Sequence, residues 1–207
     1  MVIHRKILVA STNPGKLAEI RQMLDAEVQW VGLSEFPTVS EIKEDGKTFA
    51  ENARKKALGY AKATGLWTLA DDSGLVVDAL AGQPGVKSAR FSGAKTKDRK
   101  VIDRKNIGKL LALLKNVPKE NRSARFVCCL CLTGPKEILI ETEGMLEGAM
   151  VDEPAGENGF GYDPIFFVPY LNKTVAQMTA KEKNAISHRG NAIRKLKPLL
   201  NQLLHLK

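Results

Sequence analysis

A short apolar run near the start of the chain, Ile7–Ala10, places the strongest constraint on the fold. It has no polar alternation, which is typical of a strand buried on both faces of a sheet. A tight turn follows, and Asn13 with Pro14 predicts the N-cap and the first residue of a helix. A buried strand that leads directly into a helix indicates an α/β or α+β fold with one main sheet.

The rest of the chain mixes predicted helices and strands. Thr48 and Glu51 have the spacing of a capping box and predict a helix that Gly65 ends, with Asn52 and Lys56 on one face. We expect strands over 66–70, 75–80, 124–134 and 137–148, and helices over 103–115, after Thr179, and at the C-terminal end, where Pro198 would kink or fray the helix. Because no long linker or internal repeat interrupts these elements, we expect one domain over residues 1–207.

Two adjacent carboxylates, Asp71 and Asp72, follow the predicted strand at 66–70 and precede a Ser-Gly pair that predicts a turn. The carboxyl end of a strand is the usual place for a ligand in an open α/β sheet. A divalent cation such as Mg²⁺ would relieve the repulsion between the two charges, and it is commonly held by one or two carboxylates and by substrate phosphates. The alternative is a helix cap beside a solvated turn residue.

The segment STNPGK, residues 11–16, predicts an anion site, because it joins a strand end, a tight turn, a helix N-terminus and Lys16. It lacks the Gly-Lys-Ser/Thr ending of a P-loop, so that interpretation fails. An ordinary strand-to-helix turn with an exposed lysine is the alternative.

Two later segments, 160–164 and 181–190, combine residue types that suit a heterocyclic base. Phe160 could stack on a base, while Lys183, His188 and Arg189 could donate hydrogen bonds to it. Core packing of Phe160 and a surface helix turn at His188–Arg189 are the alternatives.

The net charge of +9 permits a polyanionic partner. The basic residues are scattered, and no stripe of interleaved aromatic and basic residues of the kind that binds single strands is present. A nucleic-acid-binding module without catalytic activity is the competing function class. Glu44, Asp71 and Asp72 would repel a nucleic acid backbone, so we expect no nucleic acid partner.

Three cysteines, at 128, 129 and 131, are too few and too close together for a disulfide framework, which favours a cytoplasmic location. The few histidines are not spaced to complete a zinc site with them, so we expect buried, apolar-like cysteines. No apolar stretch approaches the roughly 20 residues of a membrane span, so we expect no membrane partner.

Five segments together resemble one enzyme family, the inosine triphosphate pyrophosphatases, also called dITP/XTP pyrophosphatases. These segments are 11–16, 44–57, 70–93, 160–167 and 182–190, and they stand in the order of the family over nearly the whole chain. The resemblance implies an α/β fold with a long twisted mixed β-sheet flanked by helices, and two lobes around a central substrate cleft. It implies hydrolysis of a deaminated purine nucleoside triphosphate to the monophosphate and pyrophosphate with Mg²⁺, by a homodimer.

The resemblance also assigns roles to residues. The phosphates would be cradled by Ser11, Thr12, Asn13, Pro14, Gly15 and Lys16, with help from Lys56. Glu44 and Asp72 would hold the metal, Asp72 would accept the proton, and Ser73 would contact the substrate. The nucleotide, chiefly its base, would be bound by Phe160, Gly161, Tyr162, Asp163, Lys183, His188 and Arg189. A related pyrophosphatase that acts on modified pyrimidines or other bases is the runner-up.

Overall fold

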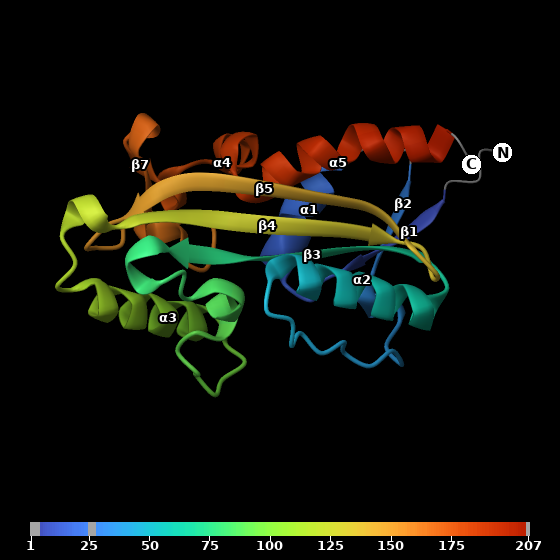
Figure 1. The fold of residues 1–207 in the computed structure, drawn as a ribbon, viewed down its shortest axis with the longest axis horizontal. Helices are drawn as coiled ribbons and strands as arrows, with labels where there is room; N and C mark the ends of the chain where they lie inside the picture. The colour runs from blue at the N-terminus through green and yellow to red at the C-terminus, as the bar shows by residue number, and fades with distance from the viewer. Residues whose placement is uncertain (1–4, 25–27, 206–207) are drawn as a thin grey trace. The chain divides into compact units, whose positions relative to one another are not determined.

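The computed structural model describes residues 5–24 and 28–205, which form a seven-stranded sheet with helices on its faces (Figure 1). The strands are β1 (Lys6–Ala10), β2 (Gln29–Gly32), β3 (Trp67–Val77), β4 (Ser123–Thr133), β5 (Ile138–Met150), β6 (Phe166–Val168) and β7 (Lys173–Thr174). The α-helices are α1 (Pro14–Met23), α2 (Phe49–Thr64), α3 (Arg99–Leu114), α4 (Ala180–Ile186) and α5 (His188–His205).

The sheet has the strand order β2-β1-β3-β4-β5-β6-β7 and is mixed. Strand β1 pairs in parallel with β2 and β3, whereas β6 pairs antiparallel with β5 and β7. The predicted α/β fold with a mixed sheet flanked by helices is therefore confirmed. No helix in the described parts of the chain is long and apolar enough to cross a membrane.

The chain divides into two compact units. The first contains the described parts of Met1–Asp72, Cys128–Gly144 and His188–Lys207, and the second contains Ser73–Val127 and Met145–Ser187. Whether the two units are lobes of one domain over residues 1–207 stays a prediction.

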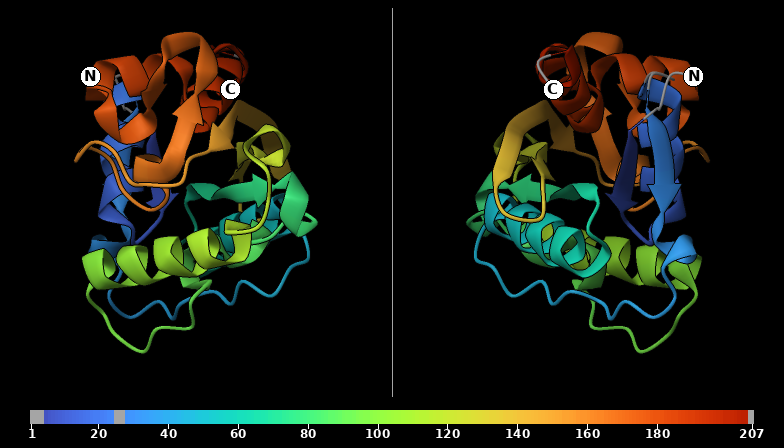
Figure 2. Two further views of the ribbon diagram at one scale, coloured as in Figure 1. Left: turned by 90° about the vertical axis from the view of Figure 1, so that its left-hand side faces the viewer. Right: turned by 90° about the vertical axis from the view of Figure 1, so that its right-hand side faces the viewer.

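In the first unit, α1 and α5 contact each other, and α5 and α2 lie on opposite sides of the strands (Figures 1 and 2). Ile7 and Val9 belong to the core on the α1 and α5 side, while Leu8, between them in sequence, is also completely buried. Burial of successive strand residues confirms that Ile7–Ala10 is covered on both faces. The other buried members of this core are Ile20, Val28, Leu69, Cys128, Leu130, Leu132, Ile140, Ala192, Ile193, Leu196 and Leu200.

The second unit has a separate core. Leu110 and Leu114 of α3 pack there with Leu75 and Val77 of β3. Its other buried members include Phe91, Ala124, Phe126, Leu146, Met150, Tyr162, Ile165, Phe166, Val168, Val175 and Met178. Each unit therefore buries its own apolar surface, which is the main source of stability for a compact unit.

The predicted helix starts follow from local hydrogen bonds. Asn13 accepts from the first turn of α1, Thr48 accepts from the backbone of Glu51, and Gly65 ends α2 with φ of 72°. Glu51 departs from the expected capping box, because its carboxylate accepts from the N–H of Lys47 rather than from that of Thr48. The helix predicted after Thr179 begins with a complete capping box between Thr179 and Glu182.

Three other expectations need correction. Strand β3 does not end at Asp71–Asp72 but continues to Val77, so the predicted Ser-Gly turn is absent. Helix α3 begins at Arg99 rather than near residue 103, because Asp98 caps it. Helix α5 continues through Pro198 to His205, so the predicted fraying at Pro198 is wrong, while the predicted kink stays a prediction.

Candidate functional site

Asp71 lies at the point where β3 loses its neighbour β1. The last pair in the parallel register is Ala10 with Ala70, so Asp71 is the first β3 residue beyond the carboxyl end of β1. The predicted position at the end of the strand that carries the two aspartates is therefore wrong, because β3 continues, but Asp71 does lie just beyond the carboxyl end of the neighbouring strand β1.

The carboxylate of Asp71 is completely enclosed by protein groups. One oxygen, Oδ1, pairs with the ammonium of Lys16. The other, Oδ2, accepts from Nε of Arg189 at 2.9 Å and from the thiol of Cys128 at 3.0 Å. Burial opposes ionisation of this group, but the charges of Arg189 and Lys16 outweigh it and hold the pKa of Asp71 well below its usual value.

Asp72 has a different environment, although it is the next residue. Its side chain is also buried, but Oδ2 has no hydrogen-bond partner among the described residues. Its nearest cationic group is the ammonium of Lys56, which lies 3.8 Å from Oδ1. Burial raises the pKa of Asp72 to about 6, and the negative charges of Glu44 and Asp71 add to this effect while Lys56 and Lys16 oppose it.

Lys56 lies between the two carboxylates that were predicted to hold a metal. Its ammonium is 3.1 Å from Oε1 of Glu44 and donates to the backbone carbonyl of Asp71 at 2.6 Å. Within the described residues, no three His, Cys, Asp or Glu side chains form a metal-binding cluster. Two carboxylates, of which Asp72 has an oxygen without a partner in the described part of the chain, fit Mg²⁺, which takes its remaining ligands from water and phosphate.

The predicted phosphate segment begins α1 in the first unit. Oδ1 of Asn13 accepts from the N–H groups of Gly15 and Lys16, and Oγ of Ser11 accepts from the N–H of Asn13. Two donors of the first helical turn are thus used by the cap. What the segment offers to an anion is the partial positive charge of the helix N-terminus and the side chain of Lys16.

Arg189 is the largest fully buried side chain of the described residues. Its guanidinium forms ion pairs with both Asp71 and Glu19 of α1. No local pattern in the sequence selects Glu19 for this role. Because the guanidinium nitrogens of Arg189 donate to two carboxylates, Arg189 neutralises buried negative charge in the first unit. The predicted contact of Arg189 with a base stays a prediction.

His188 and Arg189 are positioned by a close approach between α5 and β5 in the first unit. A side chain on Gly144 of β5 would collide with the backbone of His188 and Ala192. His188 is buried at this first turn of α5, and its predicted contact with the nucleotide also stays a prediction.

The second unit gathers the other predicted base-binding residues. The ammonium of Lys183 pairs with Oδ2 of Asp163 at 2.6 Å and lies 4.5 Å from the centre of the Phe160 ring. The same carboxylate oxygen accepts from the backbone N–H of Phe160. The cluster holds the ring of Phe160 beside the ammonium of Lys183. Such a pair suits a base, because the ring can stack on it and the ammonium can donate a hydrogen bond to it.

Neighbouring residues support this cluster. The N–H of Gly161 donates to Asp103 of α3, and the hydroxyl of Tyr162 donates to the carbonyl of Ser88. Ser73 also belongs to the second unit and lies within β3. The sequence does not predict this role for Asp103, because no local pattern connects it to Gly161, which lies 58 positions away.

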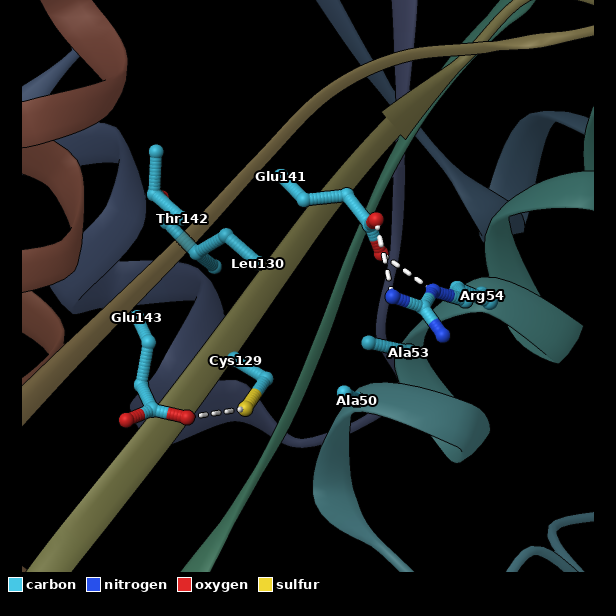
Figure 3. A pocket seen from close by; sticks show the side chains of 8 residues that line it. All are labelled: Ala50, Ala53, Arg54, Cys129, Leu130, Glu141, Thr142 and Glu143. Carbon is cyan, nitrogen blue, oxygen red and sulfur yellow. Dashed lines mark hydrogen bonds and ion pairs between the residues drawn. The ribbon is translucent and has the colours of Figure 1, made fainter.

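A small cavity of about 170 Å³ lies in the first unit between α2 and the strands β4 and β5 (Figure 3). Arg54 forms an ion pair with Glu141 at one side of it, and the thiol of Cys129 donates to Glu143 at the other. None of the residues predicted to bind substrate or metal lines this cavity.

The sequence model of the Ham1 family matches residues 7–199. The chain belongs to the Ham1 family.

Relatives of this Ham1 family chain match it over almost their full length. The dITP/XTP pyrophosphatase of Desulforamulus reducens is 48% identical over 199 residues, covering 96% of each chain. That of Bacillus subtilis is 47% identical, covering 97% of this chain and 99% of the relative. The solved structure of the Staphylococcus aureus Ham1 protein is 42% identical, with a TM-score of 0.84, and covers 96% of this chain and 99% of its own. The predicted family is therefore confirmed.

Proposed function

We propose that this chain hydrolyses deaminated purine nucleoside triphosphates, namely ITP, XTP and their deoxy forms, to the monophosphate and pyrophosphate. Membership of the Ham1 family and full-length similarity to proteins named dITP/XTP pyrophosphatase support the proposal. The observation that carries it is the buried Oδ2 of Asp72, which has no hydrogen-bond partner among residues 5–24 and 28–205 and lies next to a lysine and a second carboxylate.

Glu44 and Asp72 would hold a divalent cation, and Mg²⁺ fits their oxygen ligands. When bound, the cation would neutralise charge on the phosphate oxygens and lower the pKa of a bound water. Lys56 already lies between these two carboxylates, so the site favours positive charge at this position.

Asp72 would accept the proton of the attacking water. A pKa of about 6 leaves it mostly ionised at neutral pH, and yet basic enough to take a proton. Attack at the α-phosphorus would release pyrophosphate. The negative charge that develops on this leaving group would be stabilised by Lys16, Lys56 and the N-terminus of α1. Asp71 would act indirectly, because its paired carboxylate holds Lys16 in place.

In the second unit, Phe160 would stack on the base, and Lys183 would donate to its 6-oxo group. Asp163 would hold the ammonium of Lys183 in position, since it already pairs with that group. A 6-amino group, as in adenine, would set a donor against a donor and would be rejected.

The proposal includes a homodimer in the cytoplasm, with small-molecule nucleotides as partners. Three buried free thiols suit a reducing compartment. Light scattering coupled to size-exclusion chromatography would give twice the chain mass for a dimer, and the mass of one chain would remove this part of the proposal.

The decisive experiment is a product analysis over a panel of nucleoside triphosphates with Mg²⁺. ITP should give IMP and pyrophosphate in equal amounts, without IDP. Orthophosphate and IDP as the first products would refute attack at the α-phosphorus, and turnover of modified pyrimidine nucleotides alone would support the runner-up function.

A further inference from the structure

Two asparagines are buried in equivalent ways, one in each unit. Asn52 of α2 is completely buried, and Asn106 of α3 is 2% exposed. Each fixes a preceding loop: Oδ1 of Asn52 accepts from the N–H of Gly46 at 2.8 Å, and Oδ1 of Asn106 accepts from the N–H of Ser92 at 2.7 Å. Because a backbone N–H requires an acceptor, these bonds decide which amide atom is the oxygen.

The two side chains differ in the contacts of the amide nitrogen, Nδ2. Nδ2 of Asn106 donates to the carbonyl of Ser88 at 3.2 Å, so both the oxygen and the nitrogen of this amide have hydrogen-bond partners within the protein. Nδ2 of Asn52 has no hydrogen-bond partner among the described residues. A buried donor without a partner is costly, so this amide N–H is available to donate to a bound ligand.

The position of Asn52 connects it to the proposed cation site. Gly46 comes two residues after Glu44, so Asn52 anchors the loop that presents Glu44. A side chain on Gly46 would meet Oδ1 of Asn52 at 2.7 Å, which shows how closely the loop packs on α2. Lys56, one helical turn beyond Asn52 on the same face of α2, contacts Glu44 directly.

We propose that Asn52 is a positioning and substrate-binding residue, on the basis of the proposed cation site. Its Oδ1 holds the Glu44 loop in the geometry that binds the cation. Its Nδ2 donates to a phosphate oxygen of the bound nucleoside triphosphate. An amide N–H is unable to ligate a cation, and the triphosphate is the ligand that would bring an acceptor to this face of α2.

The test compares Asn52→Leu and Asn52→Asp with the matched control Asn106→Leu. Leucine removes both halves of the amide without adding charge, whereas aspartate keeps the acceptor and loses the donor. Mn²⁺ binding to the metal-free protein, measured by electron paramagnetic resonance, reports on the Glu44 loop without any catalysis. Steady-state hydrolysis of ITP at saturating Mg²⁺ reports on the donor, and thermal unfolding checks that each variant folds.

For the anchor, Asn52→Leu should weaken Mn²⁺ binding by about 5-fold or more, whereas Asn52→Asp should keep it, since the acceptor for Gly46 remains. For the donor, Asn52→Leu at saturating Mg²⁺ should raise the KM for ITP by about 10-fold, the effect of losing one hydrogen bond to a charged group. If Asn52→Leu does not fold, Asn52→Asp should show the same loss in KM.

Asn106→Leu should lower stability without changing Mn²⁺ affinity, because Asn106 holds no loop of the cation site. Equal effects of both leucine variants would mean general loosening and would overturn the proposal, as would unchanged Mn²⁺ affinity and KM in Asn52→Leu. A wild-type protein that neither binds Mn²⁺ nor hydrolyses ITP would instead refute the proposed function itself.

Discussion

Replacing each of the two adjacent aspartates by asparagine should change stability in opposite directions. Asp72 has a raised pKa of about 6 in the folded protein, against 3.8 for an unperturbed aspartate. A raised carboxyl pKa means that the folded state disfavours the ionised form. Stability is therefore full below the unfolded pKa and is lost as the pH rises through about 6.

The size of the loss follows from the pKa difference. About 2 pKa units at about 1.4 kcal/mol each give an upper limit of roughly 3 kcal/mol above pH 7. Asp72→Asn should recover this in the metal-free protein and raise the melting temperature by several degrees, about 2–4 °C per kcal/mol for a chain of this size. The same substitution should lower turnover with ITP by at least ~10².

Asp71→Asn is the matched control, with the opposite sign. The pKa of Asp71 is held well below its usual value, so its contribution to stability is present at neutral pH and is lost as the pH falls through the folded value. Removing its charge takes one buried carboxylate partner from Arg189 and from Lys16, and should cost about 3–5 kcal/mol.

The assay is urea unfolding between pH 4 and pH 8 in the presence of EDTA, followed by circular dichroism. The gain from Asp72→Asn should be close to zero at pH 4, where the wild-type side chain is protonated, and should grow through pH 6. Added Mg²⁺ should reduce the gain, because it stabilises only the protein that retains the carboxylate. A destabilised Asp72→Asn variant at pH 8, or a neutral effect of Asp71→Asn, would refute the reasoning.

Three further outcomes are expected. Arg189→Ala should lower the free energy of unfolding by about 3–5 kcal/mol, because Asp71 and Glu19 lose their shared guanidinium; an unchanged urea midpoint would contradict this. Lys183→Ala should raise the KM for ITP by about 10-fold with a smaller change in kcat, and an unaltered KM would remove this lysine from the base site. The unmutated enzyme should prefer ITP and XTP over ATP in kcat/KM by a factor on the order of 10⁴, and comparable values in steady-state assays would refute the assigned base contacts.

Short-range features could be predicted from the sequence. The caps at Asn13, Thr48 and Thr179 each depend on a side chain within three residues of its backbone partner. The same holds for Gly65, which ends α2 in the left-handed conformation. The buried strand at Ile7–Ala10 followed from its apolar composition, because burial on both faces leaves no polar alternation.

Features that depend on contacts between residues distant in the sequence could not be predicted from local sequence patterns. Ser73 follows two carboxylates and precedes a glycine, so it predicted a turn, but hydrogen bonding within the sheet continues β3 through it. The charge of Asp71 is tolerated there because Arg189, 118 residues away in sequence, donates to it. Local patterns in the sequence connect neither Asp71 nor Glu19 to Arg189, so these ion pairs are not predictable from them.

The burial of every cysteine provides a built-in probe of local opening. The protein has three cysteines, and all lie in β4 within the first unit, with burial raising the pKa of the Cys129 thiol to about 12. A thiol reagent can modify them only when that unit opens, so the labelling rate measures its opening free energy, in the manner of hydrogen exchange. Opening confined to the second unit would not expose the thiols, and the labelling rate would not change. Labelling beside circular dichroism would therefore separate the kinetics of the unit that carries Asp72 from those of the unit that carries Lys183.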